Sequence, residues 1–315
     1  MSKLIDYIID EARESTENEE FDETVGLSEE EIIKFINQAQ HRLHSKIVAQ
    51  HPLVFTETDT KNVIANQEAY DIDHKAYLAN KISQVEYSST GNVDDLYVLR
   101  KGYLRNRDTG AEGDPDAYIR RGGQILLLPT PLDSNGILRI TYIRKIKKLD
   151  KRRGQVKAVT LDSGTSTITN LEINYVNGST VDSTALRKNT RFTVVDKYGN
   201  IKMENILLSS LDSSVSYDTT LSVDSSFTYK SGETIEVDDY IVPGPYTTTH
   251  FELGPEVERY IQLYTEFKIL KRDSSVDSQE AFQELAEIES DIIDSYADIS
   301  DDILEIPEIN EQDWW

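Results

Sequence analysis

The stretch from Asp114 to Lys145, DPDAYIRRGGQILLLPTPLDSNGILRITYIRK, carries the sharpest local pattern in the chain. Gly122-Gly123 predict a turn, and the aliphatic run Ile125–Leu128 predicts a buried strand that the following prolines would end. Asn135-Gly136 predict a second turn, after which residues 137–146 alternate apolar with polar side chains. We therefore predict a scaffold hairpin in which residues 137–146 are the strand partner of the aliphatic run.

Helices are predicted on both sides of this β-rich stretch. Residues 2–14 form a short amphipathic pattern, and Ser28 with Glu31 forms a capping box at the start of a longer helix. That helix carries one apolar stripe at helical spacing and ends at His51-Pro52. Two further helices are expected at residues 256–272 and 277–300. The stripe of the long helix consists of Ile32, Ile36, Ala39, Leu43 and Ile47.

Residues 151–245 change in character, because they are rich in Ser, Thr, Asp and Val and show turn signals about every ten residues. This spacing predicts an inserted small β-barrel or sandwich. The fold class is therefore α+β, with a platform of N- and C-terminal helices, a β-hairpin region and the inserted β-module. The expected parts are an acidic N-terminal arm (1–27), an adaptor core (28–150 plus 246–298), the β-module (151–245) and an acidic docking tail (299–315).

The formal net charge of −24 is concentrated at the two ends of the chain. Residues 1–31 hold twelve acidic and two basic side chains, and residues 273–315 hold fifteen acidic side chains and no basic one. The remaining body is close to neutral. This balance argues against wrapping of nucleic acid, because phosphate binding needs cations that displace counterions.

Cysteine is absent from the sequence, which excludes disulfides, thiolate metal sites and cysteine nucleophiles. We therefore expect synthesis in a reducing compartment. The N-terminus lacks the apolar core of a signal peptide, and no stretch is long and apolar enough for a membrane span. We expect no membrane association.

Few residues are arranged for chemistry. His41 and His44 have a spacing that can ligate a metal, and Asp71, Asp73 and His74 imitate the start of a calcium loop. We favour the interpretation that the two helix histidines are exposed polar residues, and that the second group consists of ordinary loop residues. The adjacent carboxylates Asp94-Asp95, Asp114 with Asp116, and Asp238-Asp239 are candidates for glycosidase chemistry, but solvated loop acids explain them better. No catalytic, metal-binding or cofactor-binding residue is predicted.

Two clusters are predicted to bind partners. A basic segment is expected to contact an acidic arm between subunits; a solvated strand end and a nucleic-acid patch are the alternatives. The acidic tail carries apolar anchors that suit docking in a partner's groove, against the alternative of a free tail. The basic residues are Arg139, Arg144, Lys145, Lys147, Lys148, Lys151, Arg152 and Arg153, and the anchors are Ile303, Leu304, Ile306, Ile309, Trp314 and Trp315.

The layout resembles the head-to-tail connector family of tailed bacteriophages, the adaptor or ring proteins below the portal. The resemblance rests on four segments: EEIIKFINQAQHRLHSKIV, AYDIDHKAYLANKISQVEY, GDPDAYIRRGGQILLLPTPLDSNGILRITYIRKIKKL and LGPEVERYIQLYTEFKILKRDSSVDSQEAFQELAEIESD. It covers about residues 28–150 and 250–298. The resemblance implies a helical-bundle core, a twelve-fold ring, a C-terminal segment that docks on the portal or a neighbouring subunit, and no catalytic residues.

The inserted module and the long tail depart from the compact family pattern and are similar to ring proteins of short-tailed, crAss-like phages. We expect a non-enzymatic structural protein of the virion neck or tail, assembled in the host cytoplasm. It would join the portal to other tail or ring proteins and let DNA pass without specific binding. Residues 151–245 would point outward, toward fibres or another ring. The alternatives are a fibre-attachment or glycan-binding module led by residues 151–245, and a cell-wall glycosidase.

Overall fold

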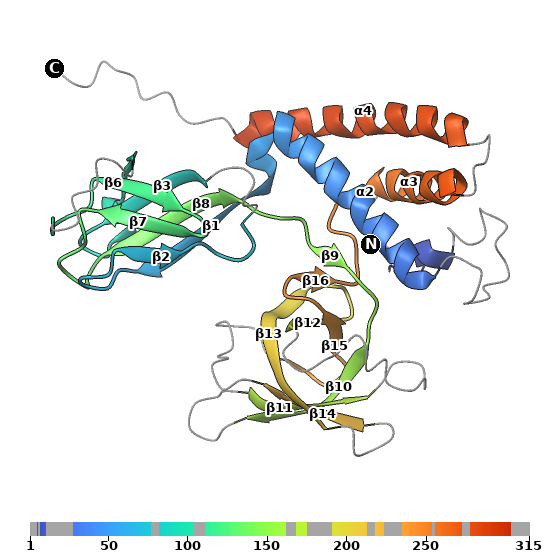
Figure 1. The fold of residues 1–315 in the computed structure, drawn as a ribbon, viewed down its shortest axis with the longest axis horizontal. Helices are drawn as coiled ribbons and strands as arrows, with labels where there is room; N and C mark the ends of the chain where they lie inside the picture. The colour runs from blue at the N-terminus through green and yellow to red at the C-terminus, as the bar shows by residue number, and fades with distance from the viewer. Residues whose placement is uncertain are drawn as a thin grey trace. The chain divides into compact units, whose positions relative to one another are not determined.

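The computed structural model describes residues 5, 7–10, 28–76, 82–103, 111–161, 168–174, 191–212, 218–223, 235–253, 256–272 and 278–303. These residues form helices and several β-sheets, which confirms the predicted α+β class (Figure 1). The chain divides into two compact units. Met1–His44 with Ile146–Ile292 is called the helix–barrel unit, and Ser45–Lys145 with Ile293–Trp315 is called the sandwich unit.

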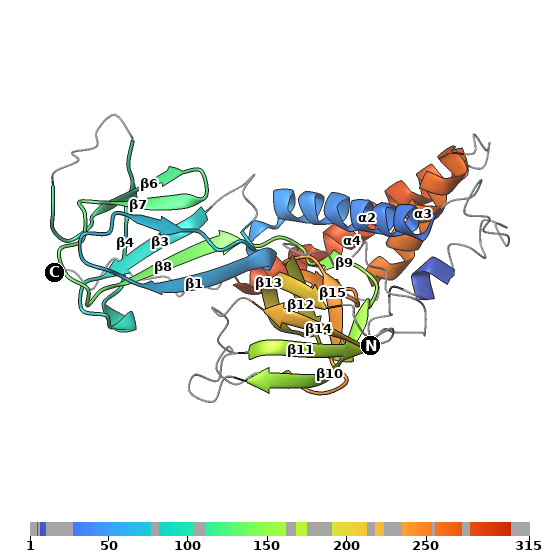
Figure 2. The same cartoon turned by 60° about the horizontal axis from the view of Figure 1, so that its bottom comes forward.

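The sandwich unit contains two four-stranded sheets, seen as stacked layers in Figure 2. A 3-10 helix, η1 (Pro52–Phe55), leads into the first sheet, and a second one, η2 (Val93–Asp95), precedes strand β4. The first sheet is antiparallel, with the order β1-β8-β3-β4, and the second has the order β2-β7-β6-β5. The strands are β1 (Thr56–Asn62), β2 (Ala69–Asp71), β3 (Ile82–Ser88), β4 (Tyr97–Val98), β5 (Arg100–Lys101), β6 (Ala117–Arg121), β7 (Gln124–Leu128) and β8 (Ile137–Ile143).

Both sheets supply the core between them. Leu138 and Ile140 of β8 are fully buried in the same apolar cluster as Ile125 and Leu127 of β7. The aromatic ring of Tyr87 on β3 completes this layer. Because apolar residues of two sheets interdigitate in one cluster, the packing is that of a β-sandwich.

One sequence prediction about this region is wrong. Gly122, with φ +61°, does turn β6 into β7, and residues 125–127 are buried as expected. However, β8 does not pair with β7, because it lies in the other sheet between β1 and β3. The chain between Pro129 and Gly136 crosses from one sheet to the other. The two apolar strands therefore meet through their side chains rather than through backbone hydrogen bonds.

Helix α2 (Glu29–Gln50) begins as the sequence predicts. The backbone N–H of Ser28 donates to Glu31 Oε2 and the N–H of Glu31 donates to Ser28 Oγ, both at 3.3 Å. This reciprocal pair satisfies two donors that the first helical turn cannot satisfy itself. The five residues of the predicted stripe, from Ile32 to Ile47, are all fully buried.

Both helix histidines are predicted to be exposed, and the prediction is correct for one of them only. His41 is exposed, but His44 is 1% exposed. His44 follows Ile36 by eight residues, which returns it to the buried side of the helix.

The C-terminal helices are α3 (Glu256–Arg272) and α4 (Ser278–Ile303). Helix α3 buries most of its surface, including Tyr260 and Ile261, as its two apolar stripes predict. On α4 the predicted Leu285 and Ile292 are buried, whereas Phe282 is 48% exposed. Among the described helices, none has a stretch both long and apolar enough to cross a bilayer.

The predicted β-module is a closed six-stranded barrel with the order β10-β11-β14-β13-β12-β15. The chain enters it after β9 (Lys148–Leu149) and leaves it before β16 (Thr247–Thr248), and these two short strands pair in parallel. Figure 1 shows this pair above the barrel. The barrel strands are β10 (Gly154–Leu161), β11 (Ile168–Asn174), β12 (Arg191–Val195), β13 (Ile201–Asp212), β14 (Asp218–Val223) and β15 (Tyr240–Pro243).

Candidate functional site

The eight basic residues predicted to form one patch are divided between the two units. Arg139, Arg144 and Lys145 belong to the sandwich unit, and the five from Lys147 to Arg153 belong to the helix–barrel unit. Each of the eight has a contact within its own unit. Their use between subunits stays a prediction.

In the sandwich unit the three basic side chains stabilise the sheet and its loops. Arg139 donates to both carboxylate oxygens of Glu86, with Nε–Oε2 at 2.6 Å and Nη2–Oε1 at 2.8 Å. This hydrogen bond raises the pKa of Arg139. The guanidinium of Arg144 lies 5.5 Å from the ring centroid of Phe55, and Lys145 Nζ donates to the His74 carbonyl at 3.0 Å.

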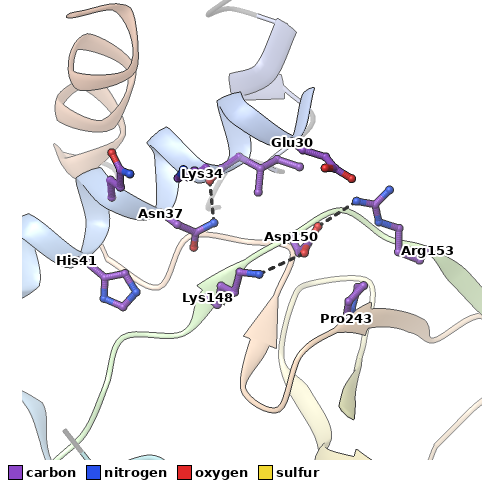
Figure 3. Close-up of a pocket in the computed structure, with 10 residues that line it drawn as sticks. Glu30, Lys34, Asn37, His41, Lys148, Asp150, Arg153 and Pro243 are labelled. Carbon is purple, nitrogen blue, oxygen red and sulfur yellow. Dashed lines mark hydrogen bonds and ion pairs between the residues drawn. The ribbon is translucent and has the colours of Figure 1, made fainter. Parts of the chain in front are cut away.

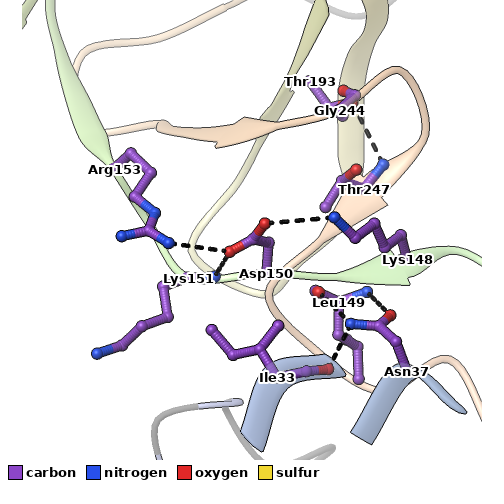
Figure 4. Close-up of polar contacts among 10 residues, drawn as sticks. All are labelled: Ile33, Asn37, Lys148, Leu149, Asp150, Lys151, Arg153, Thr193, Gly244 and Thr247. Atoms are coloured by element: carbon purple, nitrogen blue, oxygen red, sulfur yellow. Dashed lines mark hydrogen bonds and ion pairs between the residues drawn. The ribbon is translucent and has the colours of Figure 1, made fainter. Parts of the chain in front are cut away.

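In the helix–barrel unit the side chains of Lys148 and Arg153 lie beside one buried carboxylate, Asp150 (Figure 4). Asp150 is 8% exposed and accepts the backbone N–H of Lys151 at 2.8 Å. Its oxygens also lie 3.7 Å from Lys148 Nζ and 3.4 Å from an Arg153 nitrogen. Asp150 therefore holds together the turn that follows β9 through these contacts.

The other three basic residues of this unit have separate contacts. Lys151 forms an ion pair with Glu29 at the start of α2, and Lys147 Nζ lies 3.9 Å from Glu252 Oε1. The guanidinium of Arg152 lies 4.7 Å from the ring centroid of Tyr240. Glu29 lies within the acidic residues 1–31, so one acid of that segment meets one base of the patch inside a single chain.

Asn37 joins helix α2 to the entry of the barrel, and sequence reasoning missed it. Its Nδ2 donates to the carbonyls of Ile33 and Leu149, both at 2.8 Å, and its Oδ1 accepts the Leu149 N–H at 2.9 Å (Figure 4). Asn37 is 8% exposed. The side chain thus satisfies both backbone groups of β9 at Leu149, as a neighbouring strand would. An amide on the apolar side of a helix was the available signal.

A cavity of about 430 Å³ lies beside this junction (Figure 3). Its wall combines one face of α2 with β9, the turn after it and the end of β15. Both basic and acidic side chains line it, namely Lys34, Lys148 and Arg153 with Glu30 and Asp150. The remaining lining residues are Ile33, Asn37, Gln38, His41 and Pro243.

Most of the described side chains that line the cavity are polar or charged. His41 is exposed, and Asp150 already accepts several donors. Among the described residues that line the wall, none is a serine, threonine or tyrosine that could supply a hydroxyl nucleophile beside His41. Mixed charges of this kind suit complementary contacts with another protein surface.

The predicted calcium-like and metal-ligating groups do not converge. Asp71 accepts from Gln124 Nε2 at 2.8 Å, whereas Asp73 accepts the Lys75 N–H at 2.8 Å and lies 3.2 Å from His74 Nδ1. Burial alone would raise the pKa of Asp73, but these hydrogen bonds outweigh it and lower the pKa to about 2. Within the described ranges, no three His, Asp or Glu side chains are grouped to hold a metal ion.

The paired carboxylates each have a local structural contact. Asp95 accepts from the Thr90 hydroxyl at 2.6 Å, and Asp116 forms an exposed ion pair with Arg100. Asp239 is 5% exposed and lies 3.1 Å from Lys202 Nζ.

The predicted docking tail lies almost entirely beyond the described residues. Ile303 is the last residue of α4. Leu304, Ile306, Ile309, Trp314 and Trp315 lie outside the described part of the chain. Their role in docking stays a prediction.

Residues 2–154 match the profile of the SU10 adaptor protein family. The match supports a phage adaptor-type protein, as the sequence resemblance predicts. It ends at Gly154, the first residue of the barrel strand β10, and it does not extend over residues 250–298. A comparison with curated protein sequences yields no match.

Proposed function

We propose that the chain is a non-enzymatic structural protein that forms a ring between the portal and the tail of a phage virion. The match of residues 2–154 to the SU10 adaptor protein family carries this proposal. The ring would sit in the neck and let DNA pass through its lumen. We further propose that the ring has twelve-fold symmetry and that the chain is related to ring proteins of short-tailed, crAss-like phages.

The charge distribution supports such a ring. The chain has a net charge of −24, and its excess of acidic side chains lies in the segments 1–31 and 273–315. A lumen lined by acids would repel the phosphates of passing DNA, whereas a basic lumen would retain them. Unlike surfaces that meet around a closed axis also require complementary charges, which Lys148 and Lys34 at the cavity could provide.

We propose that the residues after α4 dock on the portal or on a neighbouring subunit. A chain truncated after Ile303 keeps the whole of α4 and loses the apolar anchors that follow it. We expect the truncated protein to keep its far-UV circular dichroism and to be missing from purified particles. Normal incorporation of the truncated chain would contradict docking through the tail.

The ring itself is tested by imaging the purified full-length chain and counting its symmetry by negative-stain electron microscopy. A ring with a central opening is expected at micromolar concentration or after addition of portal protein. A chain that stays monomeric with and without the portal would overturn the ring.

The closed barrel favours a second candidate for part of the chain. A barrel whose two ends enter and leave through the paired strands β9 and β16 is a separate module that can present loops outward. Attachment of tail fibres, or binding of a glycan, is the function that this module suits. Binding of a purified fibre or of a glycan array to the full-length chain, and not to a chain whose barrel is replaced by a short linker, would support it.

A further inference from the structure

Three loops meet at one end of the sandwich unit. In the first sheet Asn62 faces Ile137, and Ile137 faces Ser88 on its other side, so the ends of β1 and β3 lie level with the start of β8. The segments 63–68 and 89–96 follow β1 and β3, and 129–136 precedes β8. These three segments are called the tip loops.

Hydrogen bonds join two of the tip loops, and the third packs closely against one of them. The N–H of Ala65 donates to Ser134 Oγ at 2.9 Å, and the N–H of Asn66 donates to the Pro131 carbonyl at 2.8 Å. Gly91, with φ +75°, lies so close to the Asn135 carbonyl that a Cβ would come within 2.4 Å of its oxygen. The surface is therefore organised before any partner binds, which lowers the entropic cost of binding.

Each tip loop holds one aliphatic side chain out to solvent. Ile64 is 54% exposed, Val93 57% and Leu132 55%. The backbone of Ile64 is held in place, because its N–H donates to the hydroxyl of buried Tyr70 at 3.1 Å. A single exposed aliphatic residue is ordinary, but three on neighbouring loops at one end of a sheet indicate an interaction surface.

The charges of the tip loops all have one sign. The three segments contain Glu68, Asp94, Asp95 and Asp133, and they contain no Lys, Arg or His. A partner must therefore combine an apolar centre with a rim of Lys or Arg. A nucleic acid does not fit, because its phosphates would meet these carboxylates.

We propose that the tip loops dock onto another protein of the virion, on an apolar surface rimmed by basic side chains. This inference rests on the proposed function and adds a second contact, made by the sandwich unit rather than by the tail or the barrel. Ile64, Val93 and Leu132 are the anchors, and the acidic side chains around them select the partner and set its orientation.

Photo-crosslinking in purified particles tests this proposal. A photoreactive phenylalanine analogue replaces Val93 or Leu132 in the full-length chain, and Val237, which is 60% exposed on the other unit, provides the matched control position. We expect the two tip positions to link to one other virion protein, next to Lys or Arg residues, at about tenfold the yield of the control.

The outcomes separate the two proposals. If the chain itself is missing from purified particles, the proposed function fails. If the chain is present but the tip positions crosslink no better than position 237, the docking surface is refuted. Crosslinks only to a second copy of the chain, or to a surface without basic residues, refute the stated partner.

Substitutions provide a second measurement. Leu132→Asp changes an exposed side chain, so we expect the purified chain to keep its melting temperature while crosslinking from position 93 falls about tenfold. Val237→Asp should leave that crosslinking unchanged. An unchanged yield in Leu132→Asp would remove Leu132 from the anchors and overturn the three-loop surface.

Discussion

The two units protect their β-sheets from unwanted strand pairing in different ways. The barrel closes on itself, so its six strands leave no edge. The sandwich has open sheets, and its edge strand β1 pairs only with β8 and carries Glu57, Asp59 and Lys61. These charged side chains discourage addition of another strand. Among the described residues, the barrel therefore presents no strand edge, whereas the sandwich presents a charged edge along β1.

The largest expected effect comes from removing a buried side chain from the core of the sandwich unit. Leu138→Ala removes a fully buried side chain between the two sheets and should lower the free energy of unfolding by about 2–5 kcal/mol. Hydrogen exchange should increase throughout β1, β3 and β8 but not in the barrel strands β12 and β15.

The matched control for this substitution is Leu132→Ala, because Leu132 is 55% exposed. That change should alter stability by no more than about 0.5 kcal/mol. Equal loss of protection in both units after Leu138→Ala would show instead that the barrel and the sandwich unfold together.

The next effect concerns the attachment of the closed barrel to helix α2. Asn37→Ala leaves the buried N–H and carbonyl of Leu149 without their partner and should cost about 2–3 kcal/mol. Hydrogen exchange at the Leu149 amide should accelerate, while β8 in the sandwich keeps its protection.

Two variants sharpen this measurement. Asn37→Asp keeps an acceptor for the Leu149 N–H but loses the donor. The Leu149 amide should therefore exchange more slowly in Asn37→Asp than in Asn37→Ala. Gln38→Ala, one residue later, should leave the amide unchanged. Similar exchange rates in all three variants would show that Asn37 does not hold the barrel entry.

The smallest expected effect depends on pH and is confined to the sandwich unit. Hydrogen bonds lower the pKa of Asp73 to about 2 in the folded chain, from a usual value of 3.8. Its stabilisation is therefore complete above pH 4 and is lost as the pH falls toward 2. Asp73→Asn should cost about 2 kcal/mol at neutral pH and almost nothing near pH 2.

Thermal unfolding of the original chain and of Asp73→Asn, from pH 7 to pH 2, measures the difference in their stability. Asp71→Asn is the matched control, because the Asp71 side chain accepts an exposed hydrogen bond from Gln124 Nε2. A constant difference between Asp73→Asn and the original chain from pH 7 to pH 2 would contradict the assignment.

Helix α2 and the barrel could be predicted because their signals are local. The capping pair Ser28 and Glu31 and the stripe from Ile32 to Ile47 lie within one segment, and the repeated turns of residues 151–245 indicate short strands. The sandwich could not be predicted in the same way. Strand β8 pairs Arg139 with Thr60, far away in the sequence, so its partner cannot be read from the neighbouring turn.

The sequence predicts which basic residues belong to the candidate site, but it does not predict which side chains they contact. The sequence identifies the basic residues near the barrel entry, yet their contacts Glu29 and Glu252 come from distant segments. A charged side chain shows no local sign of its ion-pair partner. Asn37 was missed, and His44 was expected to be exposed, because each interrupts a helix pattern that otherwise fits ordinary amphipathic packing.

The parallel pairing of β9 with β16 has a consequence for how such chains diversify. Lys148 faces Thr247 and Leu149 faces Thr248, so the residues that precede and follow the barrel are neighbours in space. A gene could gain, lose or exchange the intervening segment in a single recombination event without rerouting the rest of the polypeptide. Relatives that share the flanking strands are therefore expected to have an unrelated domain, or a simple turn, between these two strands.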